Sequence, residues 1–103
     1  MELDLNGEKL DMKFSIGQTL VTRGVNDKLM DDKPFARFVA KSFCRHCNGD
    51  WGDLCEEDKL ENERALKNGN RLFSKYNYDE ETSIYIITEY NHSATTILFP
   101  DEY

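Results

Sequence analysis

The chain has 103 residues, a formal net charge of −7, and 39% hydrophobic residues. This length suits one domain with a real core, and the composition argues against general disorder. No apolar run approaches the ~20 residues that a membrane-spanning helix needs, and the opening MELDLNGEKL lacks a basic region followed by an apolar stretch, so we expect a cytoplasmic protein.

The first predicted element is a β-hairpin. Residues 2–5 alternate in polarity, Asn6-Gly7 is typical of a two-residue turn, and residues 8–14 can return as the partner strand. A further strand is expected over residues 16–22. A short helical turn over residues 27–30 follows, capped by Asn26.

A longer helix is predicted to begin at Pro34, which suits a first helical turn, and to end near Cys47. Asn48-Gly49-Asp50 then has the chemistry of a turn. Apolar and small residues recur at the three-four spacing of a buried stripe, which makes this helix the main hydrophobic anchor. The stripe contains Phe35, Phe38, Val39, Ser42, Phe43 and His46.

A second helix is predicted from Leu54 to Lys67 or Asn68. The run Asp53-Leu54-Cys55-Glu56 has the spacing of a capping box, and Gly69 is free to take the left-handed conformation after the last turn. On a helical wheel, Asp58 and Asn62 lie within the face that also carries Leu54, Cys55, Ala65 and Leu66.

The last third of the chain predicts a three-stranded antiparallel meander. Residues 71–78, 82–90 and 93–99 are rich in aromatic and β-branched residues and are separated by turn residues. One face of the meander is expected to hold the helices, and the other, which carries Phe73, Tyr85 and Ile87, to be covered by the hairpin or left open. We therefore predict one α+β domain over residues 1–103, with residues 1–14 as a hairpin extension and 15–103 as the core.

Negative charge is concentrated late in the sequence, because residues 79–103 carry six acidic side chains and no lysine or arginine. Such a surface repels nucleic acid and membranes and favours a protein with a basic surface, including one that itself binds nucleic acid. A solubilising role for the charge is the alternative. The candidate partner-binding residues are Asp50, Trp51, Asp53, Glu80, Glu81, Glu89, Asp101 and Glu102. Trp51 is also a candidate lid over the core.

His46, Asp58 and Asn62 form a second candidate constellation, because each lies on the predicted inward face of its helix. Hydrogen-bonded together they would form a buried polar cluster that fixes how the two helices pack. The alternative is an enzyme or small-ligand site around these residues, with Asp50 and Glu89 nearby. No catalytic triad spacing and no phosphate-binding glycine loop supports that alternative.

The three cysteines, Cys44, Cys47 and Cys55, raise the question of zinc. Thiolates and imidazole suit zinc, but a second ligand pair is missing, and along one helix Cys44 is expected on the side opposite His46, so we predict reduced thiols and no metal or cofactor. Cys55 in the first turn of a helix could be a nucleophile, but three acidic residues follow it and no base stands at a fixed spacing.

From about Phe14 to Tyr103 the chain resembles a family of small proteins of bacterial plasmids and integrative elements, often labelled plasmid-related. The matching segments are GDWGDLCEEDK, ENERALKNG, NRLFSKY, IYIITEY and SATTILFPDEY. The resemblance implies that the recurrent polar positions fall on His46, Asp50, Trp51, Asp53, Asp58, Asn62 and Glu89. Cys44, Cys47, the opening hairpin and Asn91-His92 depart from the family pattern, and the family carries no established activity.

These observations predict a small, acidic, non-enzymatic protein of a mobile genetic element or phage that binds a macromolecular partner. An inhibitor of a host defence nuclease, of the anti-CRISPR or anti-restriction type, is one such protein.

Overall fold

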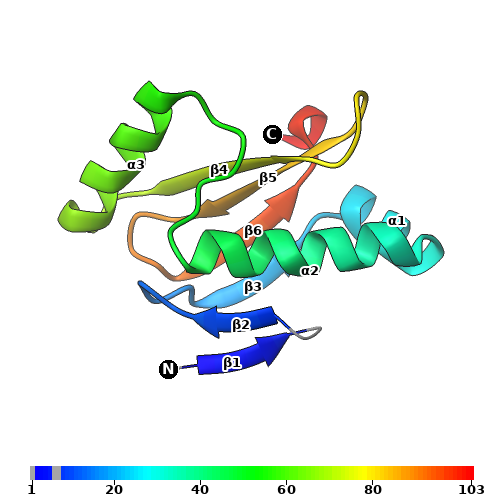
Figure 1. Cartoon of the computed structure of the whole chain (residues 1–103), viewed down its shortest axis with the longest axis horizontal. Helices are drawn as coiled ribbons and strands as arrows, with labels where there is room; N and C mark the ends of the chain where they lie inside the picture. The colour runs from blue at the N-terminus through cyan, green and yellow to red at the C-terminus, as the bar shows by residue number, and fades with distance from the viewer. Residues whose placement is uncertain (1, 6–7) are drawn as a thin grey trace.

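The computed structural model describes residues 2–5 and 8–103, and the side chains from residue 12 onward. Along the chain lie the elements β1 (Glu2–Leu5), β2 (Glu8–Asp11), β3 (Gln18–Val21), α1 (Arg23–Asp31), α2 (Lys33–Cys47), α3 (Glu56–Asn68), β4 (Leu72–Asn77), β5 (Ser83–Thr88), β6 (Ala94–Leu98) and a 3-10 turn, η1 (Pro100–Glu102). Figure 1 shows them as one α+β unit, which confirms the predicted fold class.

The central sheet has four strands in the order β3-β6-β5-β4. The predicted antiparallel meander of β4, β5 and β6 is confirmed, and β3 adds to it as a fourth strand that runs parallel to β6, with Gln18 opposite Ala94 and Val21 opposite Ile97. The sheet is therefore mixed, and its two edges are β3 and β4.

The hydrophobic core lies between one face of this sheet and the helices α1 and α2. Its central members are Val25, Phe35, Val39, Tyr76, Ile84, Ile86 and Ile97. The helix α2 begins at Lys33, one residue before the predicted Pro34, with the side chain of Asp32 accepting a hydrogen bond from the N–H of Phe35 at 3.0 Å and proline in the first turn. The predicted apolar stripe of α2 thus forms the anchor of the core.

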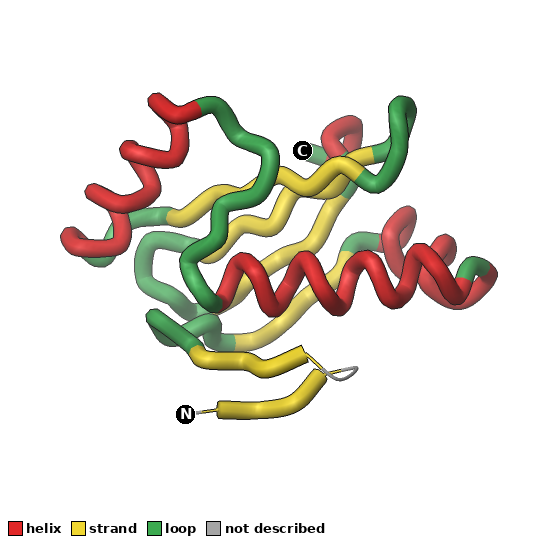
Figure 2. The backbone as a smooth tube through the Cα atoms, viewed as in Figure 1, coloured by secondary structure: helices red, strands yellow, loops and turns green. Residues whose placement is uncertain are grey.

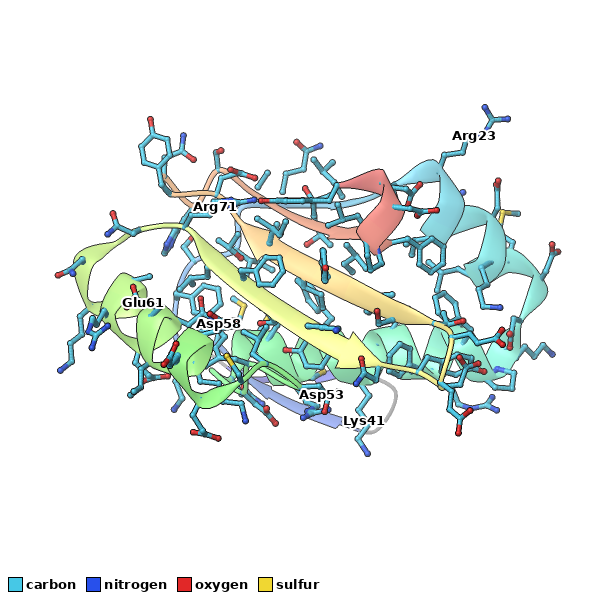
Figure 3. The ribbon with its side chains drawn as sticks, turned by 90° about the horizontal axis from the view of Figure 1, so that it is seen from above. Arg23, Lys41, Asp53, Asp58, Glu61 and Arg71 are labelled. Carbon is cyan, nitrogen blue, oxygen red and sulfur yellow. The ribbon has the colours of Figure 1, made fainter. Side chains whose placement is uncertain are left out.

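The β1-β2 hairpin packs against α2 rather than against the second face of the sheet (Figures 1 and 3). The turn residues predicted for it, Asn6 and Gly7, lie outside the described residues. Cys44 and Cys47 belong to a second buried cluster, separate from the main core, against which Met12, Ile16 and Phe43 pack. On the second face of the sheet, the ring of Tyr103 packs 6.3 Å from that of Phe73 and 5.9 Å from that of Tyr85.

Two predicted helix starts are wrong. The helix α1 begins at Arg23 after Thr22, not at Asp27 after Asn26. Asp53 does not form the predicted capping box, because its carboxylate accepts from the N–H of Asn77 on β4, and α3 begins at Glu56 with Cys55 as its N-cap residue. At the other end of α3, Gly69 takes the predicted left-handed conformation with φ of 70°. No helix among the described residues has the length and apolar character to cross a membrane.

Candidate functional site

A chain of hydrogen bonds runs through the interior from α2 across three strands. His46 Nδ1 lies 2.5 Å from Ser74 Oγ on β4, and His46 Nε2 lies 2.9 Å from Thr88 Oγ1 on β5. Thr88 Oγ1 lies 2.8 Å from Thr95 Oγ1 on β6, which donates to the carbonyl of Ile16 at 2.7 Å. We call His46, Ser74, Thr88 and Thr95 the buried relay.

The carbonyl at one end of the buried relay fixes the direction of every proton in it. Each threonine hydroxyl has one proton to donate, and that of Thr95 goes to the carbonyl of Ile16. Thr88 must therefore donate to Thr95, and His46 Nε2 must in turn donate to Thr88. The neutral imidazole accepts at Nδ1, so the Ser74 hydroxyl donates to it. The proton of the Ser74 hydroxyl therefore points at Nδ1 of His46. The same arrangement occurs where a histidine acts as the general base for a serine nucleophile.

Burial prevents this pair from acting on a substrate. His46, Ser74, Thr88 and Thr95 are all fully buried. The rings of Phe14 and Trp51 close over the imidazole at centroid distances of 5.4 and 5.7 Å. Desolvation lowers the pKa of His46 to about 3, so the ring is neutral near pH 7. The arrangement suits a sealed tie between helix and sheet better than a catalytic site.

The predicted cluster of His46, Asp58 and Asn62 does not form. Asp58 lies on the exposed surface of α3, the helix shown with its side chains in Figure 3. Asn62 is buried but contacts the backbone of Phe73, whose N–H it accepts at 3.1 Å and whose carbonyl receives its Nδ2–H. The helical wheel predicted that Asp58 faces inward, but α3 lies along the edge of the sheet and buries only a narrow stripe of its surface.

Asn62 is one of several groups that cover the outer edge of β4. The segment that joins α2 to α3 runs along this edge (Figure 2), where the N–H of Asp53 donates to the carbonyl of Lys75 at 2.7 Å. The N–H of Lys75 donates to the carbonyl of Trp51, and the Asp53 carboxylate accepts from the N–H of Asn77 at 2.9 Å. The outward backbone groups of β4 therefore find partners in the chain itself.

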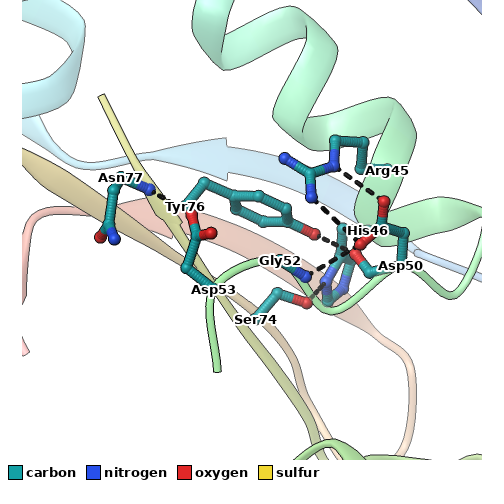
Figure 4. Close-up of polar contacts among 8 residues, drawn as sticks. All are labelled: Arg45, His46, Asp50, Gly52, Asp53, Ser74, Tyr76 and Asn77. Atoms are coloured by element: carbon teal, nitrogen blue, oxygen red, sulfur yellow. Dashed lines mark hydrogen bonds and ion pairs between the residues drawn. The ribbon is translucent and has the colours of Figure 1, made fainter. Parts of the chain in front are cut away.

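An ion pair holds the start of this segment, as Figure 4 shows. Arg45 donates to both carboxylate oxygens of Asp50, at 2.8 and 3.2 Å, and its guanidinium lies 5.1 Å from the ring centre of Tyr76. The hydrogen bond from Arg45 lowers the pKa of Asp50. Tyr76 Oη donates to the carbonyl of Asp50 at 2.6 Å, and the N–H of Gly52 donates to its carboxylate. Asp50 thus shapes the turn.

Trp51 is the predicted lid and not an exposed recognition residue. Its side chain is 3% exposed, and its Nε1 donates to Glu63 on α3 at 2.6 Å. A side chain in this position cannot offer its ring to a partner, so Trp51 is not a partner-contact residue.

The cysteines do not converge. Cys44 and Cys47 are buried and Cys55 is exposed, and all three are free thiols. Burial raises the pKa of Cys47 to about 12. Among the described residues, no group of three or more His, Cys, Asp or Glu side chains is placed to hold a metal ion.

Two further candidate partner-binding acids, Glu102 and Glu89, interact with other residues of the chain itself. The carboxylate of Glu102 accepts from Thr22 Oγ1 at 2.6 Å and from the N–H groups of Gly24 and Phe99, both at 3.0 Å. Glu89 lies 3.9 Å from Arg71, a pairing that leaves both side chains partly exposed.

The other candidate acids border a groove of about 410 Å³ between the β4-β5 turn and η1. Glu81 and Asp101 line it, Phe99 and Pro100 supply apolar surface, and Glu80 is exposed in the same turn. Lys28 of α1 also lines the groove, with its ammonium 3.4 Å from Asp32. We call Glu80, Glu81 and Asp101 the acidic rim.

The sequence did not single out Ser74, Thr88 and Thr95 as companions of His46, although all three lie in predicted strands. Their positions in adjacent strands depend on register, which alternation alone does not give. Lys28 was missed for a similar reason, since the fold and not the spacing brings α1 to the groove.

A scan against protein-family models, a search of curated proteins and a search of solved structures each return no match for this chain.

Proposed function

We propose that this protein is a non-catalytic binder that uses the acidic rim to hold a basic segment of a macromolecular partner. The observation that supports the proposal is that, in the part of the chain that the structure describes, some acidic side chains are hydrogen-bonded inside the fold while others are exposed and unpaired. Asp50, Asp53 and Glu102 are engaged in hydrogen bonds inside the fold. The three carboxylates of the acidic rim are exposed and, within the described residues, have no ion-pair partner.

The groove gives this rim a shape suited to a long cationic side chain. Lysine and arginine have apolar stems and charged heads, so the stem suits the surface of Phe99 and Pro100 while the head reaches a carboxylate. Exposed carboxylates of one sign also raise association rates with basic surfaces. Direct binding of nucleic acid or of an acidic membrane surface is disfavoured by the same charges.

The sealed buried relay weighs against the alternative of an enzyme centred on His46. A catalytic serine and histidine require access for a substrate, and both side chains here are fully buried. The resemblance to plasmid and integrative-element proteins stays a prediction. Together with the acidic rim it supports a cytoplasmic protein of a mobile element whose partner is a nucleic-acid-binding protein, such as a nuclease of a host defence system.

Charge reversal of the acidic rim tests the proposal. Wild-type protein is expected to bind a basic nuclease, either a restriction enzyme or a CRISPR effector, and to reduce cleavage of its DNA, with affinity that falls as salt rises. The triple variant Glu80→Lys, Glu81→Lys, Asp101→Lys should lose both effects.

The matched control changes three exposed acids of α3, Glu56→Lys, Glu57→Lys and Asp58→Lys, and should retain both effects. If the wild-type chain protects no nuclease substrate and captures no basic nucleic-acid-binding protein from a host lysate, the proposal is wrong. Equal losses in the two triple variants would also reject the acidic rim as the binding site.

A further inference from the structure

The two edge strands of the central sheet differ in how well the rest of the chain covers them. At β4, side chains and the 51–53 segment cover the outward backbone groups. At β3, all four residues are exposed. In the described backbone the β1-β2 hairpin forms a separate two-stranded sheet and does not extend the central one.

The hydrogen-bond pattern shows which groups of β3 are free to pair. The N–H groups of Gln18 and Thr22 donate to carbonyls of Ser93 and Ile97, beside and within β6, at 3.0 Å each. Because backbone groups alternate in direction along a strand, those of Thr19 and Val21 point away from β6. The edge therefore presents two N–H and two C=O groups to solvent.

The side chains of β3 also lack the usual protection of an edge. Native edges carry lysine, proline or an inward charge that blocks pairing with another strand. The sequence of β3 is Gln-Thr-Leu-Val, with no charge and no proline. Leu20 and Val21 are 41% and 39% exposed, so this edge presents two partly exposed aliphatic side chains next to each other.

We propose that β3 pairs with β3 of a second copy of this chain, in antiparallel orientation about a two-fold axis at Leu20. In this register Thr19 of each copy lies opposite Val21 of the other, and each pair exchanges two backbone hydrogen bonds. The two Leu20 side chains then meet as a non-hydrogen-bonded pair, the type in which side chains approach most closely. The two four-stranded sheets become one continuous sheet.

Symmetry and charge favour a second copy over another peptide as the occupant. The outward residues Thr19 and Val21 flank Leu20 evenly, so the strand is complementary to itself. Each copy carries a net charge of −7, and two such chains approach best along an uncharged strip. A basic partner finds no carboxylate on β3, so this edge is separate from the acidic rim.

The strand is short, so the dimer is expected to be weak. Four residues in a strand offer four backbone hydrogen bonds across the axis, and the contact falls below the ~1,200 Å² of a stable standard interface. We expect a monomer-dimer equilibrium that responds to protein concentration in the micromolar range or above.

Sedimentation equilibrium of the full chain, from micromolar to millimolar concentration, tests the proposal through opposite charges at Leu20. The wild-type chain should dimerise reversibly. Leu20→Lys and Leu20→Glu should each be at least tenfold weaker in self-association, because like charges then meet at the axis. An equimolar mixture of the two variants should restore the dimer, a result that requires Leu20 to face its own counterpart.

Three further variants serve as checks. Val21→Pro removes an outward N–H and should weaken the dimer while leaving the bonds to β6 in place. Leu20→Ser keeps the test usable if a charged variant does not fold, and should weaken self-association as well. Leu60→Lys, on the exposed surface of α3, should dimerise like the wild-type chain. A wild-type monomer at every concentration, no recovery in the mixture, or equal loss in Leu60→Lys would each overturn the proposal.

Discussion

The carboxylate of Glu102 caps the amino end of α1 by accepting the N–H of Gly24 at 3.0 Å. The residue in the N-cap position, Thr22, makes no side-chain cap of its own, and its hydroxyl donates to the same carboxylate. A residue far along the sequence thus performs the task that a local side chain usually performs.

Replacing Glu102 with alanine should destabilise the protein by about 1 kcal/mol at pH 7, the usual cost of a lost helix cap. The measurement is urea unfolding, and the matched control is Asp101→Ala, whose exposed side chain has no hydrogen bond among the described residues. The hydrogen bond from Thr22 lowers the pKa of Glu102, so the contribution is present above the ordinary glutamate pKa and is lost as pH falls through the lower folded value. A difference between the variants that does not shrink in acid would contradict this assignment.

Replacing Asn62 with alanine should cost about 1–3 kcal/mol, because the N–H and the carbonyl of Phe73 both lose their partner at the sheet edge. Asn68→Ala on the same helix is the control, since Asn68 is exposed and should change stability by no more than about 0.5 kcal/mol. The single tryptophan, Trp51, reports unfolding by fluorescence. Equal stability of the two variants would mean that Asn62 does not hold the edge.

The lowered pKa of His46 should make the free energy of unfolding depend on pH. Its folded pKa of about 3 lies below the ordinary value of 6.5, so between these values the unfolded chain binds a proton that the folded chain does not. Stability should therefore fall as pH drops below 6.5, by about 1.4 kcal/mol per pH unit from this group. The variant His46→Gln cannot take up that proton and should lose less stability from pH 6 to pH 4, although it starts lower. Parallel curves for the two proteins would refute the prediction.

Two glycines with similar backbone angles should tolerate alanine differently. Gly52 has φ of +78° and Gly69 has φ of +70°, so both variants carry the strain of a left-handed residue, about 1–2 kcal/mol. At Gly69 an added Cβ meets nothing within 4 Å, whereas at Gly52 it meets the carbonyl of Lys75 and the ring of Tyr76. Gly52→Ala should cost roughly 2–5 kcal/mol in total, and thermal unfolding of both variants measures the difference. Similar losses would show that the close contact of Gly52 with β4 is unimportant.

Local patterns predicted most of the fold. The stripe of α2 and the alternating strands of the meander place Phe35, Val39, Ile84 and Ile86 in the core, as expected. Those features depend on periodicity within one element, which a single sequence displays directly. The left-handed Gly69 was also predicted, and of the two roles considered for Trp51 the structure supports the lid and not the partner-binding residue.

The errors concern contacts between distant segments. Asp53 has the local chemistry of a helix cap, but the edge of β4 offers its carboxylate the N–H of Asn77 instead. Asp58 follows the helical phase of Asn62 and is nevertheless exposed, because α3 meets one edge strand and not a full layer. The parallel pairing of β3 with β6 has no local signal at all. In each case a contact between segments distant in the sequence overrides the local preference, and the spacing of residues within one segment does not reveal such contacts.

The parallel pairing of β3 with β6 bears on how the protein emerges from the ribosome. Residues 18–21 are synthesised early, yet the strand they join consists of residues 94–98. Until that later segment is available, the nascent chain can form α1 and α2 but cannot complete the sheet beneath them. The sheet should therefore be completed only after residues 94–98 have been synthesised, and folding should be slower than that of a helical protein of this size.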